Sequence, residues 1–122
     1  MNNFTSILEG RNLKIQIGNT VILDVPEIRI QAGEFLSVIG HNGAGKTTLL
    51  KMLCCLMKKP KEGEILFKDR TIGSECSLME YRRKVTMVFQ EPLLFDTTVY
   101  NNVASGLKFH GIEHSDINAI VM

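Results

Sequence analysis

The stretch Gly40-His41-Asn42-Gly43-Ala44-Gly45-Lys46-Thr47 matches the phosphate-binding loop pattern G-x-x-x-x-G-K-[ST], and Thr48 extends it. It follows a strand-like apolar run at 34–39 and precedes a helical pattern that starts at Thr48 and ends near 55–57. The glycines let the backbone curl so that successive N–H groups point inward and bind an anion, beside the positive end of a helix. Lys46 adds a full charge near the β- and γ-phosphates, and the Thr47 hydroxyl is the expected magnesium ligand. The sequence therefore predicts a nucleotide-phosphate site.

Composition places the chain among globular proteins. It has 122 residues, 44% of them hydrophobic and 22% charged, which suits one small domain or part of a larger one. The net charge of +1 argues against a nucleic-acid partner, because such modules usually carry a clear basic excess. Three cysteines, two of them adjacent, form no disulfide or metal framework, so a reducing compartment is expected. We expect neither a signal peptide nor a membrane-spanning stretch.

The rest of the chain alternates strand-like and helix-like patterns. Apolar residues recur at every second position before Gly18-Asn19, which is a hairpin turn signal. The first expected elements are strands over 11–17 and 21–23, a break at Pro26, and renewed alternation at Ile28 and Ile30. A strand over 64–67, a short helix over 78–83 and a strand over 85–89 follow further along the chain. The last expected elements are a helix from Val99 to Leu107 capped by Thr98 and, after a stop at Gly111, a helix from Asp116 capped by Ser115.

The order of elements combines signals for an antiparallel sheet with signals for a parallel sheet. The first part carries antiparallel hairpin signals, yet a strand before a phosphate-binding loop normally lies in a parallel sheet with further strand–helix units beside it. Only the runs at 34–39 and 85–89 are apolar enough for such a sheet, whose strands need cover on both faces. The sequence therefore predicts a domain of which part is missing.

Three segments of the chain resemble the N-terminal half of an ATP-binding-cassette (ABC) ATPase. They are 33–48 around the loop, Pro-Lys-Glu-Gly-Glu-Ile at 60–65, and Arg-Arg-Lys-Val-Thr-Met-Val-Phe-Gln-Glu-Pro at 82–92. The matching stretch runs from about Leu13 to Met122. The Val-Phe-Gln-Glu-Pro segment, ahead of a helix with Asn-Val-Ala-Ser-Gly-Leu, is similar to importer subunits. The run at 94–103 looks most like oxyanion importers of the tungstate, molybdate or phosphate kind.

This resemblance implies a P-loop NTPase fold of the α/β class. Residues 1–122 would form the N-terminal portion of one nucleotide-binding domain: an antiparallel β subdomain, part of the RecA-like core and the start of the helical subdomain. The implied partners are a transmembrane permease and a second ATP-binding subunit, with no nucleic acid. The implied location is cytoplasmic, on the inner face of the cell membrane through the permease. The apolar residues at 93–95 would help to receive a helix of that permease.

The implied ligands are ATP and Mg²⁺. In the family, the glutamine that matches Gln90 helps to hold the metal and the attacking water, a role that suits an amide because it can both donate and accept. Lys46 and Gln90 are thus the expected catalytic residues, and Thr47 and Gln90 the expected metal ligands. The residues expected to contact the nucleotide are Gly40, His41, Asn42, Gly43, Ala44, Gly45, Lys46, Thr47, Thr48 and, against the adenine ring, Ile17.

The chain also departs from the family pattern. It lacks the acidic pair at the end of a later strand, the Leu-Ser-Gly-Gly-Gln-type signature and the switch histidine, so the chain alone is expected to be inactive as an ATPase. Aliphatic Ile17 replaces the usual aromatic ring and would bind adenine weakly. Cys55 stands where a glycine commonly closes the helix after the loop, at some expected loss of stability.

Two other functions stay open at this level. The chain could be a non-catalytic product, from truncation or frameshift, that at most binds nucleotide or a partner. It could also be a compact P-loop kinase or other NTPase in which Asp96 anchors magnesium. Pro92 and the short apolar run at 93–95 argue against a central strand before Asp96.

Overall fold

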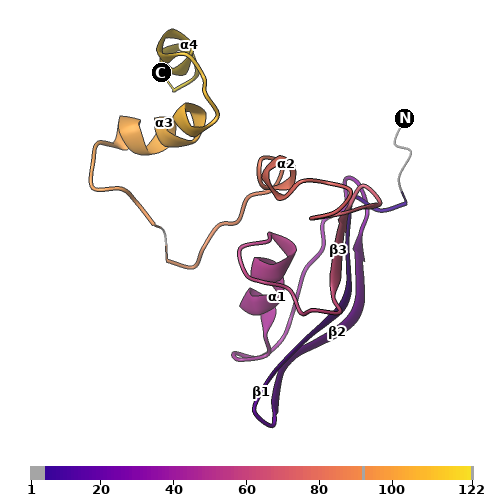
Figure 1. The fold of residues 1–122 in the computed structure, drawn as a ribbon. Helices are drawn as coiled ribbons and strands as arrows, with labels where there is room; N and C mark the ends of the chain where they lie inside the picture. The colour runs from indigo at the N-terminus through magenta and orange to yellow at the C-terminus, as the bar shows by residue number, and fades with distance from the viewer. Residues whose placement is uncertain (1–4, 92, 122) are drawn as a thin grey trace. The chain divides into compact units, whose positions relative to one another are not determined.

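A computed structural model describes residues 5–91 and 93–121, and the fold is drawn in Figure 1. The chain forms two compact units that divide after Met87. Each unit is described by itself below. Pro92, part of the segment that carries the family resemblance, lies outside the described residues.

The first unit is built on a four-stranded antiparallel sheet. Its strands are β1 (Leu8–Ile17), β2 (Thr20–Ile30), β3 (Glu64–Phe67) and β4 (Arg70–Thr71), in the spatial order β2-β1-β3-β4. The turn between β1 and β2 has Gly18 at φ 57°, a left-handed conformation that suits glycine. The predicted hairpin and the antiparallel β subdomain are therefore confirmed.

The expected break at Pro26 is wrong, because β2 continues through this residue to Ile30. On the far side of Pro26, Arg11 still pairs with Glu27 and Leu8 with Ile30. Among the described residues β2 pairs with β1 alone, so it is an edge strand, and the missing N–H of a proline can face away from the ladder. Local sequence did not reveal which strand would lie at the edge.

The core of this unit lies between one face of the sheet and two helices, α1 (Lys46–Leu53) and α2 (Leu78–Arg82), as Figure 1 shows. Tyr81 of α2 is 1% exposed, and its hydroxyl donates to the Leu53 carbonyl at the end of α1. The centroid of its ring lies 5.3 Å from the centroid of the Phe67 ring. The helix that follows the loop is thus held against the sheet through a buried aromatic pair.

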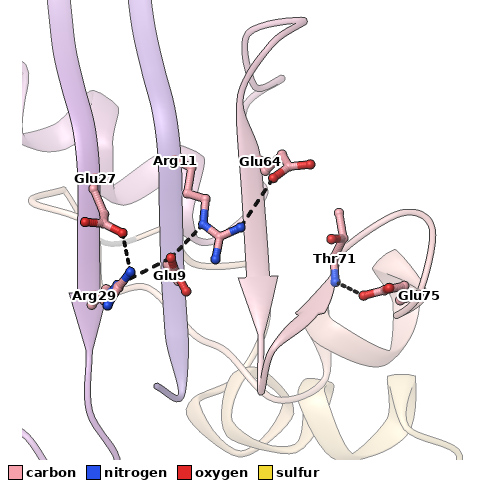
Figure 2. Close-up of polar contacts among 7 residues, drawn as sticks. All are labelled: Glu9, Arg11, Glu27, Arg29, Glu64, Thr71 and Glu75. Atoms are coloured by element: carbon pink, nitrogen blue, oxygen red, sulfur yellow. Dashed lines mark hydrogen bonds and ion pairs between the residues drawn. The ribbon is translucent and has the colours of Figure 1, made fainter. Parts of the chain in front are cut away.

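The opposite face of the sheet carries a row of ion pairs across three strands (Figure 2). From β2 to β3, Glu27 pairs with Arg29 at 2.6 Å, Arg29 with Glu9 at 3.4 Å, Glu9 with Arg11 at 2.7 Å, and Arg11 with Glu64 at 3.8 Å. The Glu9 side chain is only 5% exposed, and its hydrogen bond with Arg11 keeps the pKa of its carboxyl below the usual value. Alternating charges on paired strands favour this register over a slipped one.

Helix α1 ends in a Schellman motif with a cysteine in the glycine position. The Leu56 N–H donates to the Lys51 carbonyl at 2.9 Å and the Cys55 N–H to the Met52 carbonyl at 2.9 Å. Cys55 has φ 54°, which strains a residue with a Cβ. The expectation that glycine would suit this position better is thus supported by the backbone geometry.

We expect Cys55→Gly to raise the free energy of unfolding by about 0.5–1 kcal/mol, because glycine adopts this conformation without strain. The gain is partly offset by the loss of the half-buried side chain from the edge of the core. Urea denaturation of both proteins measures the difference. Cys55→Ala removes the sulfur but keeps the Cβ, and it should not be stabilising. Equal stability of the glycine and alanine variants would contradict the backbone explanation.

The two strands predicted for a parallel sheet are not formed in the described residues. Segments 34–39 and 85–89 carry no strand assignment, and Phe35, Ile39 and Val88 are 97%, 92% and 92% exposed. A strand is stable only where a neighbour satisfies its backbone groups, and no strand is formed beside either segment in the described residues. Of the predicted RecA-like core, the described residues therefore form the phosphate-binding loop and α1. Helix α1 starts at Lys46 rather than at Thr48, where the sequence pattern had placed its start.

The second unit contains helices α3 (Val99–Phe109) and α4 (His114–Val121). Thr98 caps α3 as predicted, since its hydroxyl accepts from the Asn101 N–H at 3.1 Å, and Gly111 follows the helix at φ 75°. The prediction for α4 is wrong at its start. The Ile117 N–H already donates to the Glu113 carbonyl at 3.0 Å, so Ser115 lies inside the first turn. In the part of the chain that the structure describes, none of the helices has the length and hydrophobicity of a membrane span.

Candidate functional site

The loop between residue 40 and α1 has a curled backbone. Gly43 and Gly45 have φ 87° and 90°, and the Ala44 N–H closes a turn on the His41 carbonyl at 3.1 Å. The chain then enters α1 directly, with the Leu49 N–H donating to the Gly45 carbonyl at 2.9 Å. The first N–H groups of a helix have no partner within it. This arrangement brings unpaired helix donors next to a left-handed glycine loop, as anion binding requires.

The ammonium group of Lys46 lies against the start of the same loop. Its Nζ donates to the carbonyl oxygen of Gly40 and, at 2.8 Å, to that of His41. A lysine has three N–H donors, so two hold the loop closed and one is left for an anion. Lys46 thus joins the two ends of the loop and places a positive charge beside its first residues.

A glycine is needed at position 45 for its positive φ and also because there is no room for a side chain. The place of Gly45 in the motif did not reveal the second reason. A Cβ at this position would lie 2.7 Å from the Ile22 carbonyl oxygen and 3.2 Å from Cδ1 of Leu23. The loop therefore rests against the backbone of β2. At Gly43, by contrast, an added Cβ would meet nothing within 4 Å. The motif fixes a glycine at position 45 and leaves position 43 open, but only the fold shows which atoms would collide with a Cβ at Gly45.

The remaining loop residues lie at the surface, where a nucleotide could reach them. His41, Asn42, Gly43, Ala44 and Thr47 are exposed, and Thr48 is half-buried. Ile17 is 68% exposed at the end of β1, in the same hairpin as the Ile22 carbonyl that contacts Gly45. Contact of these side chains with a nucleotide stays a prediction.

Gln90 and Asp96 belong to the second unit, and both are exposed. Asp96 does not follow a strand, since residues 93–95 have no strand assignment. The arrangement of an apolar strand that ends in a magnesium-binding acid is therefore not formed around Asp96 in the described residues. The role of Gln90 as a metal ligand stays a prediction.

One residue of this unit was not assigned a role from the sequence. The Asn102 side-chain amide binds the backbone of the segment in front of α3. An asparagine in the first turn of a helix is a common local signal for such contacts, but the sequence does not say which main-chain groups it reaches.

A left-handed glycine loop that opens a helix and is closed by its own lysine has the features of the phosphate-binding loop of a P-loop NTPase. The family model for ABC transporters matches residues 23–121. The chain belongs to the ABC transporter family, which confirms the family resemblance and the fold class.

Three relatives are named as ATP-binding proteins of import or uptake systems. The chain is 38% identical over 118 residues to methionine import ATP-binding protein MetN of Francisella tularensis, covering 91% of this chain and 33% of that protein. It is 36% identical over 111 residues to tungstate uptake system ATP-binding protein TupC of Peptoclostridium acidaminophilum, covering 91% of this chain and 49% of that protein. It is 33% identical over 116 residues to phosphate import ATP-binding protein PstB of Thermotoga maritima, covering 91% of this chain and 46% of that protein. The chain thus spans a third to a half of the length of these relatives.

Proposed function

We propose that this chain is the nucleotide-binding portion of an ATP-binding subunit of an ABC importer, with Mg-ATP as its ligand. The observation that carries the proposal is the loop closed by Lys46 through the carbonyls of Gly40 and His41. Importer subunits among the relatives support the same role.

In this proposal the loop N–H groups and the third N–H of Lys46 bind the phosphate chain. The Thr47 hydroxyl, exposed in the first turn of α1, would hold Mg²⁺ together with Gln90. The metal, when bound, neutralises charge on the phosphate oxygens. Oxygen ligands of this kind suit magnesium, which usually binds through few protein groups and the substrate phosphates. Ile17 would contact the base.

Partners are part of the same proposal. In the complete protein, a second ATP-binding subunit and a transmembrane permease would assemble with this one at the cytoplasmic face of the membrane, and ATP hydrolysis would be coupled to transport. Leu93 and Leu94, which are 84% and 77% exposed, would contact a helix of the permease. The three relatives are named for different substrates, so we assign the choice of substrate to the permease rather than to this chain.

Isothermal titration of the chain with Mg-ATP tests the proposal. We expect measurable binding that weakens by about tenfold or more when EDTA removes the metal, because Thr47 and Gln90 then lose the ion through which they would hold the phosphate chain. Gln90→Ala should reduce the gain that magnesium gives, and Asp96→Asn should leave it unchanged. The reverse result, with Asp96→Asn abolishing the gain and Gln90→Ala neutral, would favour a compact P-loop kinase or NTPase. Absence of any Mg-ATP binding would overturn the assigned ligand.

A further inference from the structure

A cavity of about 360 Å³ lies in the first unit, where the chain leaving α1 meets β3 and α2. Its apolar lining comes from Leu56, Met57, Ile65, Ile72 and Leu78. Ile65 and Ile72 are 2% and 8% exposed, so the inner wall of the cavity is the core of this unit. Small-molecule sites in proteins have volumes of about 300–1,000 Å³. The phosphate-binding loop precedes α1, whereas this cavity follows the last turn of α1, so the two are separate sites.

Three cations line the same cavity, namely Lys58, Lys59 and Arg82. The Arg82 Nη2 donates to the Cys55 carbonyl at 3.0 Å, which holds the guanidinium at the wall. None of the described residues that line the cavity is acidic, and no carboxylate among the described residues lies within ion-pair distance of the three cations. Burial raises the pKa of the Cys55 thiol, so the thiol adds no negative charge at neutral pH. The cavity therefore joins an apolar inner wall to a positive rim.

We propose that this cavity binds a small amphiphilic anion of the class of medium-chain carboxylates. The apolar chain lies against Ile65, Ile72 and Leu78, where its burial removes apolar surface from water. The carboxylate lies at Lys58 and Lys59, where it is attracted by both charges and keeps part of its hydration. A neutral apolar ligand would not use the cations, and an inorganic anion would not cover the apolar wall. A recessed site also suits a small molecule better than the surface of a bilayer.

NMR titration of the whole chain with decanoate, kept below its micelle concentration, tests the inference. With labelled isoleucine methyl groups, we expect saturable shifts at Ile65 and Ile72 and a Kd of about 1 mM or lower. Decanol should bind at least about threefold more weakly, and decylammonium at least about tenfold more weakly, because the rim attracts anions and repels cations. Mg-ATP should not displace decanoate, since the phosphate-binding loop lies at the other end of α1.

Leu78→Asp and Met79→Asp form a matched pair on α2. Leu78 lines the cavity and Met79 does not. Both residues lie in the first turn of α2, where a carboxylate suits the helix N-terminus, so both variants should fold. Leu78→Asp should weaken decanoate binding by at least about tenfold, because it puts a like charge into the apolar wall. Met79→Asp should keep the affinity within about twofold.

Two double variants test the positive rim, and each removes two lysine charges from the chain. Lys58→Ala with Lys59→Ala should weaken decanoate binding by about fivefold or more. Lys61→Ala with Lys84→Ala should keep it within about twofold, because neither residue lines the cavity. Equal losses in the two double variants would show an effect of net charge and would overturn the inference.

Other results would also overturn the inference. These are no saturable shift at Ile65 and Ile72, equal effects of Leu78→Asp and Met79→Asp, or displacement of decanoate by Mg-ATP. Binding to phosphatidylglycerol vesicles without binding of free decanoate would assign this face to a membrane surface instead. Self-association of the chain that Leu78→Asp abolishes, again without decanoate binding, would assign it to a second copy. If Leu78→Asp fails to fold, the two lysine double variants decide.

Discussion

Lys46→Ala is expected to weaken Mg-ATP binding by about 100-fold or more. Two unit charges about 4 Å apart attract by roughly 4 kcal/mol at an effective dielectric near 20, and about 1.4 kcal/mol corresponds to a tenfold change in affinity. Lys46 is only half-buried, so solvent reduces the full value, and a loss near 3 kcal/mol is a realistic expectation. The variant also loses the bonds to Gly40 and His41 that close the loop.

Isothermal titration measures this effect, and Lys51→Ala serves as the control. Lys51 lies in the last turn of the same helix and carries the same charge. Its removal should change the affinity by less than about threefold, because Lys51 follows the loop by more than one helical turn and solvent and salt weaken its attraction for a bound phosphate. Unchanged affinity in Lys46→Ala would refute the assigned site. A similar loss in both variants would point to net charge rather than to the loop.

Gly45→Ala should have the largest effect on folding, with an expected loss of about 2–4 kcal/mol of unfolding free energy. Gly45 has φ 90°, a conformation that residues with a Cβ rarely adopt. The added methyl group would also lie 2.7 Å from the Ile22 carbonyl oxygen. Because that atom belongs to the backbone of β2, relief requires the loop to move away from the sheet. Nucleotide affinity should therefore fall together with stability.

Gly43→Ala separates the effect of backbone strain from the effect of the steric clash with β2. Its φ of 87° is nearly the same as that of Gly45, yet the added Cβ would meet nothing within 4 Å. We expect it to cost about 1–2 kcal/mol, from backbone strain alone. Thermal unfolding of both variants gives the comparison, and a shift of several degrees per kcal/mol is expected for a domain of this size. Equal melting temperatures would show that the contact with β2 contributes nothing.

Several elements could be predicted because their signals are local. The hairpin turn at Gly18, the Thr98 cap of α3 and the left-handed Cys55 at the end of α1 each depend on a few adjacent residues. The strand at 64–67 follows from a short apolar run after a glycine. In these cases the preference of the backbone and the final structure agree.

Other predictions failed because the outcome depends on residues outside the local stretch. Residues 34–39 and 85–89 have the composition of buried strands, but a strand forms only beside another strand. Pro26 breaks a central strand but not an edge strand, and the position of β2 in the sheet is a property of the whole fold. Asparagine is a residue type that often binds main-chain groups near the start of a helix. Which main-chain groups Asn102 binds, however, depends on how residues 95–98 fold back towards α3.

The amino-acid order alone determined that a phosphate-binding loop would follow residue 39 and open a helix, because glycine conformation and a lysine at fixed spacing act within eight residues. It also carried the family resemblance. Tertiary structure alone decided that Gly45 must rest on the carbonyl of Ile22, that Glu9 is buried among arginines, and that Asn102 binds both main-chain groups of Phe95. These contacts join residues whose meeting depends on how the chain packs, and packing is a property of the assembled fold rather than of any short stretch.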